Sequence, residues 1–447
     1  MNHKIYKKEI FIYISLTLIA YFSIIFGFFQ NEDLAGGAMQ DFNFYIGILN
    51  NFRDDFLFSF LNYKELGSDH SPFFVSLLTL VNIPLGDLNI INTKELKFDA
   101  GNALLEYGNK YTFLRFIYLH ICLLTPVIFY KCLKIIYKDT KNITLFFLSI
   151  LILFSPHFRA YSIWAGETNL ALLFLLISIY FYLRLVEETY KNKNKYFLII
   201  FLNIFFMAMA AHARPIYCLI SIFFFLKYLQ IFKFKTEIIQ FILLNIIFAF
   251  PAFYYFVLLD NYPFVLYSNF FYNPSLTLYS TNIILSSSII FFYCMPFLIV
   301  NFKNNKFLLN KKNIFLIIIS LLLSFILLQN FQYNEMMGGG GIFYQISNKI
   351  FGNNYFLYFI SILSIYFVLT IASKSLNDFT LLFIIICFDP DPWIYHKSFE
   401  PILFCLLLTL FDNKNFKNLN SNNEKKISTV VSVYYLLVFF LYIFIRS

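Results

Sequence analysis

The feature that most constrains this chain is the recurrence of long apolar runs along its whole length. A transmembrane α-helix needs about 20 predominantly apolar residues, and runs near this length recur in a sequence that is 60% hydrophobic and 13% charged. We therefore predict an all-α, polytopic transmembrane helical bundle of about 13 spans. Their approximate limits are 10–29, 111–130, 143–157, 166–186, 196–212, 215–232, 237–259, 282–301, 313–330, 354–372, 379–389, 397–411 and 428–445.

The basic residues indicate how these spans are oriented. Most of the 34 Lys and Arg residues cluster in alternate connections, for example at Lys4–Lys8, Lys131–Lys141 and Lys303–Lys312. Cytoplasmic loops of membrane proteins collect Lys and Arg, so the alternation predicts a cytoplasmic N-terminus and an external region 30–110. The same rule accounts for the net charge of +9, and we predict no nucleic-acid partner. No repeat, soluble domain or linker stands out, so residues 1–447 are predicted to form one membrane domain.

The first external region is unusually acidic. Its segment from Gln30 to Pro72 contains the acids Glu32, Asp33, Asp41, Asp54, Asp55, Glu65 and Asp69. Residues 73–88 are apolar but interrupted by polar, proline and glycine residues, which predicts an interfacial or re-entrant helix. Residues 52–60 fit a second short helix lying on the membrane. We expect the active site in this region.

Two pairs in this region suggest chemistry. Asp41 and Tyr45 are four residues apart and would share one face of a helix. Asp69 adjoins His70 before a proline, and such a pair either binds a divalent cation or lets the carboxylate fix the imidazole tautomer. A divalent cation is the only cofactor that the sequence suggests.

Basic residues also lie at external membrane edges, where they are disfavoured. Arg159, Arg214 and Lys397 are such residues, and snorkelling would explain one of them. Because all three lie near acids or histidines, they predict a site for an anionic group such as phosphate. Their neighbours His212, His396 and Glu167 are the accompanying candidates, although Glu167 could simply stabilise a helix N-terminus.

Several classes of protein are disfavoured. The chain has no nucleotide-binding, serine-hydrolase or zinc-protease motif. Its six cysteines are scattered singly without a CxxC pair, so no disulfide framework or zinc cluster is expected. Ionisable residues gather at one predicted face of the membrane, which favours chemistry there on a lipid-linked phosphate substrate.

Five short segments carry a resemblance to a known superfamily: GGAMQDFNFY and SDHSPFF in the first loop, and later SPHFRAYSIWAGETNL, HARPIY and WIYHKSFEPILF. They resemble motifs of the polytopic GT-C glycosyltransferases, which use polyprenyl-phosphate sugars. GGAMQDFNFY stands where that superfamily has an acidic motif, and SDHSPFF is similar to the segment that closes its first loop. The sequence departs from the pattern because Phe42, not a second acid, follows Asp41, so Glu32 and Asp33 are the alternative acidic pair.

The resemblance implies a hexosyl- or pentosyltransferase of the bacterial cell envelope. It would move a sugar from a polyprenyl-phosphate donor to a glycan, lipid or protein acceptor, by an inverting displacement at the external face of the inner membrane. Asp41 would be the general base, with Glu32 and Asp33 as alternatives. The substrate-binding residues would be Tyr45, Asp69, His70, Arg159, Glu167, His212, Arg214, His396 and Lys397, with Asp69 and His70 as possible metal ligands.

Two other functions fit a polytopic protein of this kind. A flippase or transporter of lipid-linked saccharides would need polar groups through the middle of the bundle. An O-antigen polymerase or ligase would carry its large external loop late in the chain. The early position of the acidic loop favours the glycosyltransferase.

Overall fold

The structure is a computed structural model in which regular secondary structure, within the described residues, is entirely helical. The described residues are 2–34, 37–66, 71–85, 111–189, 196–232, 235–258, 275–301, 311–333, 339–387, 394–413, 416 and 424–446. They divide into two compact units: unit 1 comprises Met1–Cys218, Phe234–Val265 and Tyr435–Ser447, and unit 2 comprises Leu219–Lys233 and Leu266–Tyr434. The single domain over 1–447 stays a prediction.

Most of the expected spans correspond to long helices. Nine helices of the described residues are long and apolar enough to cross a membrane, and a bent pair makes a tenth if it forms one span. This supports an integral membrane protein. The expected spans at 313–330 and 379–389 coincide with shorter apolar helices, Ile314–Gln329 and Leu376–Ile386. The expected span at 397–411 contains only the eight-residue helix Ile402–Thr409.

The bent pair lies where the span at 143–157 was expected. Helix α8 (Asn142–Ile150) continues as the short helix η3 (Leu151–Phe154), and α9 (Pro156–Ile163) then turns by 63°. Pro156 causes the break because a proline ring cannot continue the preceding helix, whereas it fits the first turn of the next. The Ser155 side chain accepts a hydrogen bond from the Phe158 backbone N–H at 3.1 Å and caps α9.

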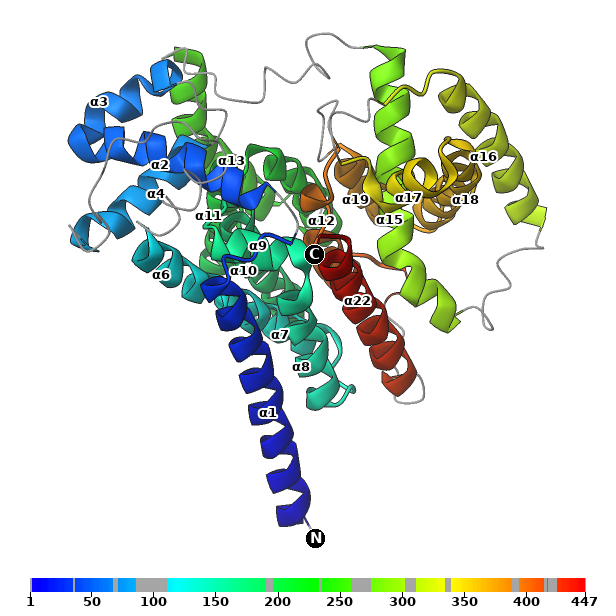
Figure 1. Ribbon diagram of the computed structural model, residues 1–447, viewed down its shortest axis with the longest axis horizontal. Helices are drawn as coiled ribbons and strands as arrows, with labels where there is room; N and C mark the ends of the chain where they lie inside the picture. The colour runs from blue at the N-terminus through cyan, green and yellow to red at the C-terminus, as the bar shows by residue number, and fades with distance from the viewer. Residues whose placement is uncertain are drawn as a thin grey trace. The chain divides into compact units, whose positions relative to one another are not determined.

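Unit 1 is organised around α10 (Glu167–Thr189), which packs along α7 (Leu124–Ile136) and α11 (Tyr196–Ala213), as Figure 1 shows. The helix α13 (Thr236–Phe253) lies on the other side of α11. The long helix α1 (Asn2–Phe29) contacts α8 and α9. Its N-terminal half extends beyond the other helices of this unit (Figure 1).

The first loop folds into short helices at one end of unit 1. These are α2 (Ala38–Asp54), α3 (Phe56–Leu61), η1 (Tyr63–Leu66) and α4 (Pro72–Asn82). They lie at the end away from the N-terminus of α1 (Figure 1). Helix α2 buries Phe42, Tyr45 and Leu49, one side of an amphipathic pattern, against α4 and α9. Helix α6 (Thr112–Cys122) packs on α9 and also contacts α4.

Unit 2 is built around α18 (Tyr355–Ala372). It packs on α15 (Leu276–Asn301), α16 (Lys311–Gln329), α17 (Gly341–Phe351) and α19 (Leu376–Ile386). Buried serines such as Ser287 on α15 and Ser361 on α18 permit close helix packing. The remaining helices are α12 (Ile220–Phe232), which packs on α19, and α20 (Ile402–Thr409), which packs on α15. The helix α22 (Glu424–Arg446) begins in unit 2 and ends in unit 1.

A polar cluster joins three parts of unit 2. The Lys227 ammonium lies 2.9 Å from Asp412 Oδ2, which also accepts a hydrogen bond from Asn377 Nδ2 at 2.6 Å. The fully buried Asp378 accepts from the Asp412 backbone N–H at 2.7 Å. These bonds hold the segment after α20 against α12 and α19.

The orientation of the first loop is open to a direct test. In a protein whose exposed Cys218 is replaced by serine, we expect a membrane-impermeant maleimide to label Glu65→Cys in intact cells. Asp139→Cys, in the exposed turn after α7, should be labelled only after the membrane is permeabilised. The reverse pattern would show that the first loop faces the cytoplasm.

Candidate functional site

The first loop is closed onto α9 by an ion pair between Glu32 and Arg159. Arg159 Nε donates to Glu32 Oε1 at 2.6 Å, and a terminal guanidinium nitrogen lies 2.5 Å from Glu32 Oε2. The same guanidinium also donates to the Ser23 hydroxyl and backbone carbonyl, at 3.1 and 3.0 Å. The side chains of Arg159 and Glu32 are 2% and 13% exposed, so this is a nearly buried, bidentate pair.

This pairing changes the roles that the sequence suggested. Arg159 was expected to hold a phosphate, and Glu32 was an alternative catalytic base. Both Glu32 oxygens accept from Arg159, and burial makes separation of the pair costly. The geometry therefore favours a structural role for both residues.

A second arginine, which the sequence reasoning missed, supports the same loop. Arg115 on α6 is 1% exposed and stacks on the Trp164 ring, with its guanidinium carbon 3.7 Å from the ring centroid. Its Nε donates to the Ile163 carbonyl at 2.9 Å and a terminal nitrogen donates to Asn31 Oδ1 at 3.0 Å. Trp164 Nε1 donates to the Glu32 carbonyl at 3.1 Å. The sequence signal was a charged residue inside an apolar run.

Asp41 lies in the first turn of α2 and is held by a tyrosine of α9. The Tyr161 hydroxyl donates to Asp41 Oδ2 at 2.8 Å. The Tyr161 ring packs so closely on Gly166 that a Cβ at this glycine would collide with it. The position of the Asp41 carboxylate is therefore fixed by a side chain that is itself fixed, and nothing in the sequence pointed to Tyr161.

Tyr45 and Glu167 complete what we call the Asp41 cluster: Asp41, Tyr45, Tyr161 and Glu167. Tyr45 is fully buried one turn after Asp41. Its burial, and then the negative charges of Glu167 and Asp41, raise the pKa of the Tyr45 phenol well above its usual value. The hydroxyl therefore stays protonated at physiological pH and remains a hydrogen-bond donor. The expected shared face of Asp41 and Tyr45 is present in α2.

The cluster lies next to the N-terminus of α10, where the segment before α4 and the residue after α11 also make contacts. The Ser71 backbone N–H, just before α4, points at Glu167 Oε2 at 3.5 Å. Next to Glu167, the Thr168 hydroxyl accepts from half-buried Arg214 at 2.9 Å. Arg214 follows α11, so the chain brings a predicted anion-binding cation close to Glu167, a predicted substrate-binding residue. Helix N-termini also favour negative charge.

The other residues proposed for unit 1 are placed differently. Asp33 accepts from the Met39 backbone N–H at 3.3 Å, beside the start of α2. His212 connects three helices, because its Nε2 lies 3.0 Å from the Phe248 carbonyl and its own carbonyl accepts from the Ser71 hydroxyl. This gives His212 a packing role. Asp69 and His70 lie outside the described residues, so their proposed metal or acceptor role stays a prediction.

In unit 2 the two late candidates lie in the segment before α20. His396 is buried and its Nδ1 is 3.0 Å from the Tyr293 hydroxyl. The Lys397 ammonium lies over the Tyr395 ring, 5.3 Å from its centroid. The described residues contain no group of three or more His, Cys, Asp or Glu side chains arranged to hold a metal ion.

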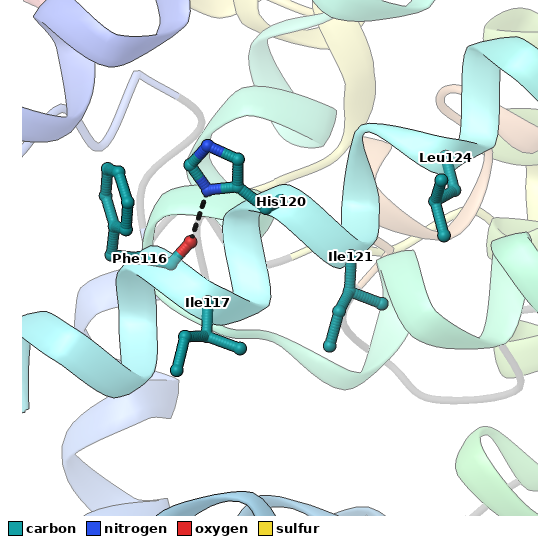
Figure 2. A pocket seen from close by; sticks show the side chains of 5 residues that line it. All are labelled: Phe116, Ile117, His120, Ile121 and Leu124. Atoms are coloured by element: carbon teal, nitrogen blue, oxygen red, sulfur yellow. Dashed lines mark hydrogen bonds between the residues drawn. The ribbon is translucent and has the colours of Figure 1, made fainter. Parts of the chain in front are cut away.

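A shallow apolar hollow on α6 and the start of α7 surrounds another histidine. Figure 2 shows its lining residues, which are Phe116, Ile117, His120, Ile121 and Leu124. His120 Nδ1 lies 2.8 Å from the Phe116 carbonyl, and its Nε2 lies 3.1 Å from the Tyr21 hydroxyl of α1. These two contacts fit a histidine that joins two helices.

In three comparisons with known proteins, the chain matched no family model, no curated protein and no solved structure. The resemblance to GT-C glycosyltransferases therefore depends on the sequence motifs alone.

Two glycines provide a matched test of the ion pair. A Cβ at Gly27 of α1 would collide with the Glu32 carboxylate and come within 2.8 Å of Arg159, whereas a Cβ at Gly47 of α2 would meet nothing within 4 Å. We expect Gly27→Ala to destabilise the protein by about 1–3 kcal/mol through overpacking. Gly47→Ala should be neutral or slightly stabilising, because alanine is the better helix former.

The measurement is thermal unfolding of both full-length variants in the same lipid nanodiscs. If Gly27→Ala unfolds at the same temperature as Gly47→Ala, the ion pair does not fill the space beside α1.

Proposed function

We propose that this protein is a membrane glycosyltransferase that moves a sugar from a polyprenyl-phosphate donor to an acceptor hydroxyl at the extracytoplasmic face. The observation that carries the proposal is the Asp41 cluster beside Arg214. It combines a carboxylate oriented by a phenol, a second carboxylate and a cation at one end of unit 1. The sequence resemblance and the predicted external position of the loop support the same reaction.

In the proposed reaction, Asp41 acts as the general base. The acceptor hydroxyl gives its proton to the Asp41 carboxylate while its oxygen bonds to the anomeric carbon of the donor sugar. The bond between that carbon and the phosphate oxygen breaks, and polyprenyl phosphate leaves. One displacement inverts the anomeric configuration. The Tyr161 hydroxyl occupies Oδ2 and thereby orients the carboxylate for this transfer.

The leaving phosphate needs a cation, and Arg214 suits that role better than Arg159. Arg159 donates to Glu32 through Nε and one terminal nitrogen and to Ser23 through its terminal nitrogens. Arg214 is half-buried and donates to the Thr168 hydroxyl, next to Glu167, at 2.9 Å. A guanidinium there would stabilise charge that develops on the phosphate. Glu167 would contact sugar hydroxyls, whereas the fully buried Tyr45 would position the Asp41 and Glu167 carboxylates.

The role of Asp41 is tested by Asp41→Asn, which keeps the size of the side chain but removes the base. We expect transfer to fall about 10²–10⁴-fold, the usual contribution of a general base. The measurement is the amount of sugar-modified product and of lipid-linked donor in membranes of cells that carry each variant. Asp54→Asn, at the exposed opposite end of α2, is the control and should keep full transfer. Normal transfer by folded Asp41→Asn would exclude Asp41 as the base.

The role of Arg214 is tested by binding of a polyprenyl phosphate to the purified protein in nanodiscs. We expect Arg214→Lys to weaken binding about tenfold or more, because a forked, charge-assisted contact is replaced by a single point charge. Arg53→Lys makes the same replacement at an exposed position of α2 and should bind as the unmodified protein does. Equal affinities for the two variants would remove Arg214 from the phosphate site.

A further inference from the structure

Unit 2 contains a buried acid, phenol and imidazole that the proposed reaction does not use. The Tyr293 hydroxyl donates to Glu400 Oε2 at 2.8 Å and lies 3.0 Å from His396 Nδ1. Tyr293, Glu400 and His396 are 1%, 2% and 7% exposed. We call these three residues the Glu400 triad.

The triad contacts a helix that is long enough to span a membrane. Helix α15 is a candidate span over Leu276–Val300, and Tyr293 lies about 7.5 Å from its middle and about 10.5 Å from its C-terminal end. The Glu400 triad therefore lies within the C-terminal half of the candidate span. An ionisable side chain at this depth is costly, and such residues usually mark a path or site for ions or protons.

Interrupted backbone reaches the same depth. Residues 394–401 contain only one three-residue helical turn, His396–Ser398, before the short helix α20. The Gly340 N–H donates to the Ile394 carbonyl at 2.8 Å, which brings the glycine segment before α17 to this place. A Cβ at Gly341 would lie 2.9 Å from the Ile289 side chain of α15 and 3.7 Å from His396 Nε2. Non-helical backbone at membrane depth is tolerated only inside protein or beside water, and interrupted helices surround the ion sites of many transporters.

The hydrogen bonds indicate which member takes up a proton. His396 is buried, and its Nδ1 lies 3.0 Å from the Tyr293 hydroxyl. Because the Tyr293 proton points to Glu400, the Tyr293 oxygen accepts, and this assigns the His396 proton to Nδ1. The remaining acid is the Glu400 carboxyl, whose ionised form is disfavoured by burial and favoured by the hydrogen bond from Tyr293.

Further titratable side chains lie near the Glu400 triad. Tyr434 lies within electrostatic reach of it, and its hydroxyl donates to the Phe292 carbonyl. The nearby Lys397 ammonium is directed over the Tyr395 ring. The titratable groups placed around Glu400 thus include Tyr293, His396, Tyr434 and Lys397, together with Cys294, which is an electrostatic neighbour of Tyr434.

We propose that Glu400 is a proton-binding site within the membrane-spanning part of unit 2, with Tyr293 and His396 as its positioning residues. A proton from water adds to the carboxylate and gives a neutral carboxyl group, and its release reverses the step. This function is independent of the Asp41 cluster and of glycosyl transfer. It supplies the kind of buried polar group that proton-coupled movement of a substrate through a membrane requires.

The test is infrared difference spectroscopy of the full-length protein in lipid nanodiscs during a pH titration. We expect a protonated-carboxyl band that disappears as the pH rises and that is absent from Glu400→Gln. Glu424→Gln changes another buried glutamate of unit 2 and should keep this band. Tyr293→Phe removes the hydrogen bond to the carboxylate and should shift the midpoint upward by about one pH unit or more.

Two results would overturn the proposal. One is a folded Glu400→Gln variant whose carboxyl bands equal those of the unmodified protein from acidic to alkaline pH. If Glu400→Gln does not fold, the comparison with Tyr293→Phe decides, and an unchanged carboxyl titration in that variant excludes the site.

Discussion

The buried ion pair between Glu32 and Arg159 determines how the first loop of unit 1 folds back on the helices. It joins the end of α1 to α9 through two short contacts, and Gly27 leaves the space that the two charged groups occupy. Removing one partner of such a pair typically costs about 3–5 kcal/mol, because the other charge stays buried. The stack of Arg115 on Trp164 holds the same loop from the side of α6. Because α2 follows this loop, the ion pair and the stack together hold Asp41 in its position beside Tyr161.

Three acids at this end of unit 1, Glu32 and Asp41 of the first loop and Glu167 of α10, have different surroundings. Glu32 is neutralised by a guanidinium that occupies both of its oxygens, which makes it a good structural anchor and a poor base. Asp41 accepts a hydrogen bond from the Tyr161 hydroxyl at 2.8 Å, which orients its carboxylate. Glu167 begins a long helix, where the peptide dipoles favour a negative charge. At this end of unit 1, Glu32 thus anchors the loop, Asp41 is the proposed base and Glu167 begins a helix.

The helical class and the long helices could be predicted because hydrophobic runs of sufficient length depend only on local sequence. Short elements could not be predicted as reliably. The expected span 143–157 bends at Pro156, and the expected span 397–411 contains a helix of only eight residues. A short helix can be apolar because it is buried among other helices of its unit and not only because it faces lipid. The sequence did select Asp41 and Tyr45, whose spacing puts them on one helix face. It could not reveal that Arg159 pairs with Glu32, since 127 residues separate them. Tyr161 and Tyr293 were invisible for the same reason, in a chain with 33 tyrosines.

The short helix α20 has a consequence for how the protein is made. All of its residues, Ile402–Thr409, are buried, yet eight helical residues cover only about 12 Å of a hydrocarbon core about 30 Å thick. The translocon recognises longer apolar segments, so α20 cannot enter the bilayer as an independent hairpin partner. Its apolar side chains are instead buried by packing on helices such as α15, which is synthesised earlier. We therefore expect α20 to fold against α15 after the longer helices of unit 2 have been inserted.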